Sequence, residues 1–243
     1  MQTSDRRIAV VTGGNKGIGF AIARGLAQAG DQVLIGCRDG ARGEAAAASL
    51  RAEGLVVDAL PLDVTDDASI AAAAKLVETR FGRLHVLVNN AGIALDRQTG
   101  TLPLSQIMRD TFAVNVIGVA CMIEAFAPLL ARSKAGRIVN LSSGLGSLAL
   151  NSDPAGEYAA FKFPAYNSSK AAVNMLTVVY AARLADKGIK VNAVDPGYTA
   201  TDLNAHRGTR TPAQGAAIAV RLASLDDAGP TGGFFDEAGV VSW

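Results

Sequence analysis

The chain alternates short apolar runs rich in β-branched residues with longer alanine-rich segments along its whole length of 243 residues. The first six apolar runs are nearly continuous, as expected for strands that are buried on both faces of a parallel sheet. The predicted strands are Ile8–Val11, Val33–Gly36, Val56–Leu60, Leu84–Asn89, Arg137–Leu141, Lys190–Val194 and Gly233–Phe235. The predicted helices are Gly17–Ala29, Ala41–Glu53, Ala68–Arg80, Leu104–Ala131, Tyr166–Asp186 and Ala213–Ser224. This order predicts an α/β fold in which helices cover both faces of a parallel sheet.

No linker, repeat or low-complexity tract divides the chain, so we predict one domain over residues 1–243, a single Rossmann-type doubly wound sheet of about seven parallel strands. Residues 144–165 are rich in turn formers and predict a long irregular loop, inserted at the carboxyl end of a strand where open α/β sheets bind ligands. The polar segment 198–212 is typical of a lid that closes over a substrate.

Composition excludes several classes of protein. With 49% hydrophobic and 19% charged residues and a net charge of +1, the chain suits a globular fold and gives no argument for nucleic acid or an acidic membrane surface. We expect no membrane span. Cys37, Cys121, His85 and His206 show no metal-type clustering, so no metal is predicted. The start MQTSDRR leaves no room for a signal peptide, and a cytoplasmic location is the expectation.

A tyrosine and a lysine stand four residues apart in Tyr166-Asn-Ser-Ser-Lys170. On a helix they share one face, and a cation beside a phenol lowers the pKa of that phenol. Such a pair could protonate an oxygen and take the proton back. The spacing alone also suits an ordinary helix face.

A glycine-rich turn joins the first strand to the first helix in Thr12-Gly-Gly-Asn-Lys-Gly-Ile-Gly19. Glycines 13, 17 and 19 allow close approach of a ligand, and the helix amino terminus offers N–H groups to a phosphate. The spacing differs from the common G-x-G-x-x-G fingerprint, and a purely structural turn remains an alternative.

Taken together with Asn89-Asn-Ala-Gly92, Asn115, Ser142-Ser143 and Tyr166-x-x-x-Lys170, the chain resembles the short-chain dehydrogenase/reductase family over nearly its whole length. Pro196-Gly197, Thr211-Pro212 and the ending Gly232-Gly-Phe-Phe-Asp236…Trp243 resemble the carbonyl-reductase-like members. The resemblance implies a reductase that uses a dinucleotide.

The resemblance also implies a catalytic tetrad. Tyr166 would donate a proton to the substrate carbonyl, and Lys170 would lower the pKa of Tyr166 and bind the nicotinamide ribose. Ser143, rather than Ser142, would orient the carbonyl. Asn115 would hold a water that connects Lys170 to solvent, although a buried asparagine could simply satisfy nearby backbone.

The cofactor predicted is NADP(H). An enzyme that prefers NAD normally has an acidic residue at the end of the second strand. In this chain Cys37 and Arg38 stand there instead, and Lys16 lies in the glycine-rich turn. Two cations suit a 2′-phosphate, whereas Asp39 lies one residue late for the NAD role. The predicted cofactor-binding residues are Gly13, Asn15, Lys16, Gly17, Ile18, Gly19, Arg38, Asp63, Val64, Asn90, Ala91, Gly92, Tyr166, Lys170, Pro196, Gly197, Thr199 and Thr201.

We therefore predict an NADP(H)-dependent oxidoreductase of a small carbonyl or alcohol substrate. Apolar residues flanking the tetrad indicate an apolar substrate; they are Leu145, Leu148, Leu150, Tyr158, Phe161, Phe163, Tyr198 and Leu203. Two alternatives are a 3-oxoacyl reductase, which would use Arg132, Lys134 and Arg137 to receive an acidic carrier, and a regulatory protein that senses NADP(H). Whether the chain is a monomer or a homo-oligomer stays open, because the 144–165 loop is about ten residues longer than the spacing typical of the family.

Overall fold

A seven-stranded parallel sheet forms the centre of the molecule, which is described by a computed structural model over residues 6–96 and 100–243. The strands are β1 Ile8–Thr12, β2 Gln32–Cys37, β3 Val57–Pro61, β4 Val86–Asn89, β5 Arg137–Leu141, β6 Lys190–Val194 and β7 Phe234–Phe235. Their order is β3-β2-β1-β4-β5-β6-β7, and every pair of neighbours is parallel. The predicted fold class is confirmed, and the order reverses between β1 and β4, where doubly wound sheets bind their ligands.

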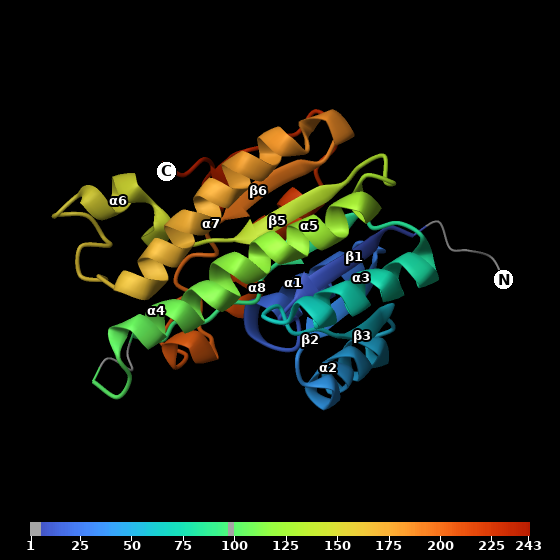
Figure 1. The fold of residues 1–243 in the computed structure, drawn as a ribbon, viewed down its shortest axis with the longest axis horizontal. Helices are drawn as coiled ribbons and strands as arrows, with labels where there is room; N and C mark the ends of the chain where they lie inside the picture. The colour runs from blue at the N-terminus through green and yellow to red at the C-terminus, as the bar shows by residue number, and fades with distance from the viewer. Residues whose placement is uncertain (1–5, 97–99) are drawn as a thin grey trace.

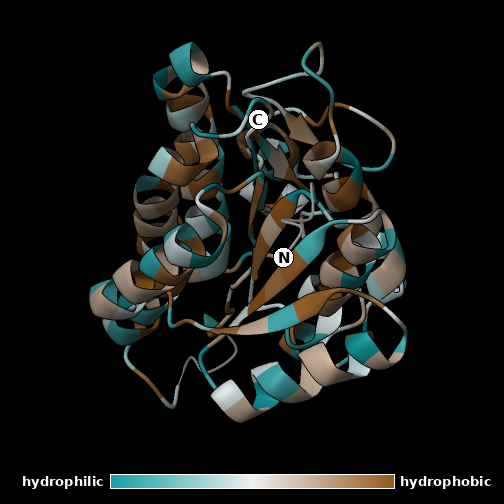
Figure 2. Ribbon diagram, turned by 90° about the vertical axis from the view of Figure 1, so that its right-hand side faces the viewer, coloured by the Kyte–Doolittle hydropathy of each residue, from teal (hydrophilic) through white to brown (hydrophobic). Residues whose placement is uncertain are grey.

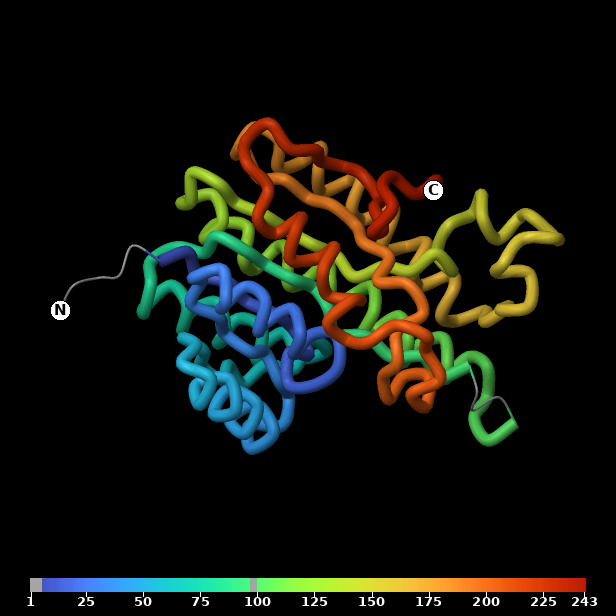
Figure 3. The backbone as a smooth tube through the Cα atoms, turned by 180° about the vertical axis from the view of Figure 1, so that it is seen from behind, coloured from blue at the N-terminus to red at the C-terminus, as the bar shows by residue number. Residues whose placement is uncertain are grey.

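Helices cover both faces of this sheet. They are α1 Gly17–Gln28, α2 Gly40–Ala52, α3 Asp67–Phe81, α4 Leu104–Phe112, α5 Gly118–Leu130, α6 Leu148–Ser152, α7 Pro164–Arg183 and α8 Pro212–Ala223. Helices α3, α5 and α7 lie on one face (Figure 1), and α1, α2 and α8 lie on the other (Figure 3).

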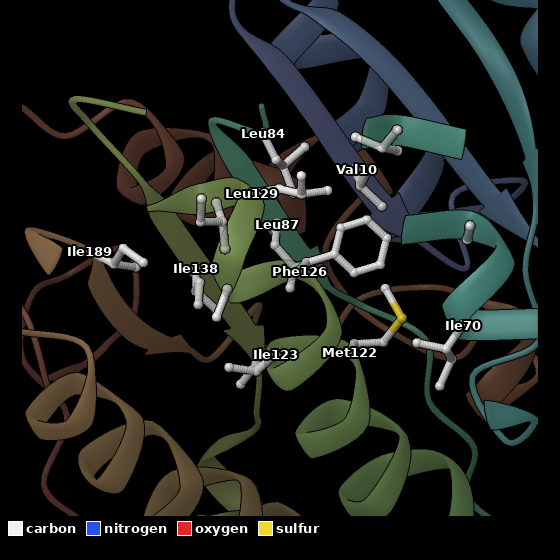
Figure 4. Close-up of a cluster of buried hydrophobic side chains, with 14 of the residues drawn as sticks. Val10, Ile70, Leu84, Leu87, Met122, Ile123, Phe126, Leu129, Ile138 and Ile189 are labelled. Carbon is white, nitrogen blue, oxygen red and sulfur yellow. The ribbon is translucent and has the colours of Figure 1, made fainter. Parts of the chain in front are cut away.

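Each face has its own hydrophobic core. Phe126 of α5 is fully buried against β1, β4 and β5, as the close-up in Figure 4 shows. On the opposite face, Ile22 and Leu26 of α1 pack with Ile218 and Leu222 of α8. The strands are mostly apolar, although β5 contains Arg137 and Asn140, whereas the helices carry polar and apolar residues in alternation (Figure 2).

The predicted helix Leu104–Ala131 is one continuous helical run, but it contains a wider turn. Residues Ala113–Ile117 form a π-helical segment between α4 and α5, and Pro128 lies inside α5. By length and composition alone, Leu104–Leu130 could cross a membrane, a test that core helices also pass. Half of its most apolar window is buried here, so we interpret it as a core helix.

Residues 144–165 contain more regular structure than predicted. A 3-10 turn at Gly144–Gly146 leads into α6, and Asn151 donates hydrogen bonds to the carbonyls of Gly144, Leu145 and Ser147. These bonds hold residues 144–151 in a defined local structure, which the composition of the segment does not predict. The segment projects beyond the sheet on the left of Figure 1.

Candidate active site

The helix that carries the tyrosine and the lysine begins at Pro164, two residues earlier than predicted. Proline suits the first turn because it has no N–H to satisfy, but α7 has no side-chain cap of its own at Phe163. The cap comes from Asp96, whose carboxylate accepts the backbone N–H of Ala165 at 2.8 Å and of Tyr166 at 3.0 Å. Asp96 was not among the predicted site residues because nothing local in the sequence links it to a helix 69 residues away.

Tyr166 and Lys170 share one face of α7, as the spacing predicted. The Lys170 ammonium lies 5.6 Å from the centre of the Tyr166 ring and donates a 2.6 Å hydrogen bond to the carbonyl of Leu141, at the end of β5. Burial lowers the pKa of Lys170 to about 8, although the nearby Asp195 carboxylate acts in the opposite direction.

The pKa of Tyr166 shifts in the direction opposite to the one expected. Burial raises it above its ordinary value, Asp195 raises it further, and a hydrogen bond with Ser143 lowers it. The net shift is upward because burial disfavours the phenolate more than the nearby groups favour it. At neutral pH Tyr166 therefore holds its proton.

The two adjacent serines have different surroundings. Ser142 is buried and its hydroxyl donates to Asn174 Oδ1 at 2.6 Å, which makes it part of the packing between β5 and α7. Ser143 hydrogen-bonds with the Tyr166 hydroxyl and lines a cavity. Only Ser143 can reach a substrate together with Tyr166.

Asn115 lies in the π-helical segment, a type of local widening that is frequent at functional sites. Its side chain accepts the N–H of Ile93 at 2.8 Å and donates to the Ile93 carbonyl at 2.9 Å and to Ser169 Oγ at 3.0 Å. Asn115 thus ties the segment after Gly92 to α7. The predicted role in holding a water remains a prediction.

The glycine-rich turn is shaped for the close approach of another group. Gly13 has φ 63° and Gly17 has φ 56°, and a side chain at Gly19 would collide with Asn90 and the Gly13 carbonyl. Helix α1 begins at Gly17 with no side-chain cap, so its amino terminus can receive a phosphate. Asn15 and Ile18 lie beside these glycines, and this turn fits a dinucleotide.

Asn90, predicted to contact the cofactor, makes bonds to the glycine-rich turn itself. Its amide donates to the carbonyls of Thr12 at 2.8 Å and Gly13 at 3.1 Å, while Thr12 Oγ1 accepts the N–H groups of Asn90 and Ala91, each at 2.9 Å. These bonds fix the ends of β1 and β4 together. Asn90 therefore supports the predicted cofactor site by holding the backbone of the glycine-rich turn.

At the predicted adenosine end, Arg38 and Asp63 come together. Burial raises the pKa of Asp63, but hydrogen bonds from Thr65 and the nearby Arg38 guanidinium outweigh it and hold the pKa below its ordinary value. Val64 packs against Gly118. Arg38 is exposed at this edge and could meet a phosphate.

Lys16 does not stand free beside Arg38. Its ammonium pairs with Asp202 of the 198–212 segment at 2.6 Å, and Asp202 also contacts His206 at 2.8 Å. Ala205 and His206 adopt left-handed backbone conformations, which are uncommon for residues with side chains. The predicted lid therefore lies against the glycine-rich turn.

A cavity of about 720 Å³ opens beside Tyr166 and Ser143, the size of a small-molecule site. Six of the predicted apolar residues line it: Leu145, Tyr158, Phe161, Phe163, Tyr198 and Leu203. Leu148 is instead 71% exposed on α6. Pro196, Gly197, Thr199 and Thr201 line the same cavity, so the expected nicotinamide segment and the substrate walls meet at Tyr166.

The cavity also has an acidic lining that the sequence reasoning missed, formed by Asp96, Glu157, Asp195, Asp236 and Glu237. One cation, Arg210, lines it too, and that cation is paired with Glu237. Asp195 is only 8% exposed, and burial together with Asp236 and Glu157 raises its pKa, against hydrogen bonds from the Gly197 and Gly144 backbones. These acids come from four separate segments of the chain, so no local sequence pattern predicts that they lie together.

No group of His, Cys, Asp and Glu side chains in residues 6–96 and 100–243 could hold a metal ion. Cys37 and Cys121 are free thiols.

Comparison with known proteins places this geometry among enzymes. A family model described as short chain dehydrogenase matches residues 7–211. The chain is 35% identical to carbonyl reductase [NADPH] 1 of Sus scrofa, with 99% of this chain and 96% of the relative covered. It is 32% identical to (+)-neomenthol dehydrogenase of Capsicum annuum, with 96% of each covered.

Among solved structures, the fold superposes on NADPH-bound carbonyl reductase from chicken fatty liver with a TM-score of 0.85. The two chains are 30% identical, and the match covers 98% of this chain and 99% of the other. The likeness to these proteins therefore extends over nearly the whole chain.

Proposed function

We propose that this chain, which belongs to the short-chain dehydrogenase/reductase family, is an NADPH-dependent reductase of ketones or aldehydes. Membership makes it an NAD(P)-dependent oxidoreductase that acts on CH–OH or C=O groups. The choice of NADPH, the direction and the substrate class are the proposal. The observation that carries it is that Tyr166 and Ser143 line a substrate-sized cavity together with Ile18 of the glycine-rich turn, while the Lys170 ammonium lies 5.6 Å from the centre of the Tyr166 ring.

The residues of the site divide the work of reduction. The nicotinamide, when bound, supplies the hydride to the carbonyl carbon. Ser143 and Tyr166 converge on one region of the cavity, where their hydroxyl groups can hold the carbonyl oxygen. Tyr166 is protonated at neutral pH and can donate its proton to that oxygen.

Three features support NADPH over NADH. Arg38 follows Cys37 at the end of β2, where an acid would favour NAD, and it lies near Asp63. Lys16, in the glycine-rich turn, is held by an exposed ion pair with Asp202, which a more highly charged phosphate can replace. Relatives that are named for NADPH or bind it match this chain over nearly its whole length.

The lining of the cavity favours neutral or cationic carbonyl compounds over carboxylates. Aromatic walls such as Tyr158 and Tyr198 suit apolar or cationic groups, and the carboxylates of Glu157 and Asp195 repel anions. The 3-oxoacyl alternative is weakened further, because Arg137 is buried at the opposite, amino-terminal end of β5.

The test is NADPH oxidation by the wild type against ketones, aldehydes and quinones, with a ketone carboxylate and a 3-oxoacyl thioester as anionic probes and NADH as the competing cofactor. We expect turnover of neutral carbonyl compounds that exceeds turnover of the anionic ones and is faster with NADPH. Preferred reduction of the acyl thioester would support the 3-oxoacyl reductase instead. Tight NADPH binding with no turnover of any probe would support the sensing protein.

A further inference from the structure

Asp96 holds the first turn of the catalytic helix with both of its carboxylate oxygens. Oδ1 accepts the Ala165 N–H at 2.8 Å and Oδ2 accepts the Tyr166 N–H at 3.0 Å. Helix α7 has no cap from its own side chains, and Pro164 offers no N–H. The amino terminus of the helix that presents the reacting phenol is therefore fixed by a residue from the loop after β4.

That loop is also tied to α7 at a second point. Asn115 holds both backbone groups of Ile93 and donates to Ser169 on α7. The stretch from Gly92 to Asp96 thus runs from the predicted cofactor-binding loop to the backbone of Tyr166 itself. It is a short brace between the loop beside the cofactor and the proton donor.

We propose that Asp96 is a positioning residue for the reduction, one that sets where the Tyr166 hydroxyl stands relative to the cofactor loop. The proposal rests on the proposed function. A carboxylate at a helix amino terminus is favoured by the helix dipole, and its two oxygens hold two consecutive N–H groups in one orientation. Since a misplacement of about 1 Å can cost roughly 100-fold in rate, release of this turn should slow the chemical step.

Two substitutions separate positioning from simple capping. Asp96→Ala removes both acceptors, whereas Asp96→Asn keeps one and points an N–H₂ group at the other amide. The matched control is Asp66→Ala, because exposed Asp66 also caps a helix amino terminus, that of α3, through one 2.9 Å bond from the Ala68 N–H. Asp66 does not line the cavity, so its loss should weaken a cap without moving Tyr166.

The experiment measures kcat, the dissociation constant for NADPH and the hydrogen exchange of the Ala165 and Tyr166 amides in the full chain. We expect Asp96→Ala to lower kcat about 10-fold or more, to leave NADPH binding within about two-fold, and to lose protection at both amides. Asp96→Asn should lie between this variant and the wild type. Asp66→Ala should keep its kcat and the protection of both amides.

A kcat within about two-fold of the wild type in Asp96→Ala would overturn the proposal even if protection is lost, because Asp96 would then be only a cap. If Asp96→Ala does not fold, Asp96→Asn decides in the same way. An equal loss of kcat in Asp66→Ala would also overturn it. A wild type that reduces no carbonyl compound refutes the proposed function and this proposal together, whereas an active wild type with an active Asp96→Ala refutes this proposal alone.

Discussion

Replacing Lys170 with Met should change how the stability of the protein depends on pH. The ammonium of Lys170 is only 5% exposed, and burial lowers its pKa from 10.5 to about 8. One pKa unit corresponds to about 1.4 kcal/mol, so keeping Lys170 charged in the folded state costs about 3 kcal/mol.

The sign of the effect follows from proton binding. Below pH 8 the lysine is protonated in both the folded and the unfolded state, and the full cost is present. Between pH 8 and 10.5 the unfolded chain keeps the proton while the folded protein releases it, so the free energy of unfolding rises with pH. By about pH 9.5 the wild type should regain about 2 kcal/mol from this residue.

Urea unfolding of the wild type and Lys170→Met at pH 7 and at about pH 9.5 provides the test. Met cannot titrate, and the loss of the hydrogen bond to Leu141 is a constant offset that cancels between the two pH values. The free energy of unfolding of the wild type should therefore rise by about 2 kcal/mol relative to the variant. A difference that does not change with pH would show that the pKa of Lys170 is not lowered by burial.

Other residues give predictions of the same kind. Tyr166→Phe should leave NADPH binding nearly unchanged and lower turnover by roughly 100-fold or more, and steady-state rates within a few-fold of the wild type would rule out the general acid. The wild type should prefer NADPH over NADH by roughly 100-fold in kcat/KM, and Cys37→Asp combined with Arg38→Ser should reverse this preference. A wild-type ratio of kcat/KM for NADPH over NADH below one would refute the cofactor assignment. A preference for NADPH that survives both substitutions would point to Lys16. Arg137→Ala should lower the free energy of unfolding by about 2–3 kcal/mol, because it removes the hydrogen bonds of a fully buried guanidinium to the Gly136 and Leu225 carbonyls, while kcat stays unchanged; an unchanged urea midpoint would contradict this.

The sheet could be predicted because the strands that are buried on both faces consist largely of apolar residues in the sequence. Runs such as Ile8–Val11 are apolar at every position, so they announce a strand covered on both faces. The π-helical segment at Ala113–Ile117 could not be predicted in this way, since it keeps the apolar pattern of a helix and changes only the hydrogen bonding. The start of α7 was missed for a related reason, because its cap lies in Asp96 and not in a neighbouring residue.

The site was predictable where neighbouring residues define it and unpredictable where the fold assembles it. Tyr166 and Lys170 are joined by helical spacing, and Ser143 is the second residue after a strand. Asp195 is different, because its effect on Tyr166 depends on burial and on the distance between segments. The direction of the Tyr166 pKa was therefore predicted wrongly from a lysine four residues away, since burial was the larger influence.

The reaction and the choice of substrate depend on different parts of this chain. Tyr166, Lys170 and Asn115 lie on helices that pack against the sheet, and their hydrogen bonds reach β5 and the loop after β4. Most of the remaining cavity walls come instead from residues 144–165, from 198–212 and from 236–238, segments outside the parallel sheet. A substitution in these walls can change which carbonyl compound fits without moving the proton donor, whereas a change in the brace that ends at Asp96 acts on the backbone that carries the proton donor.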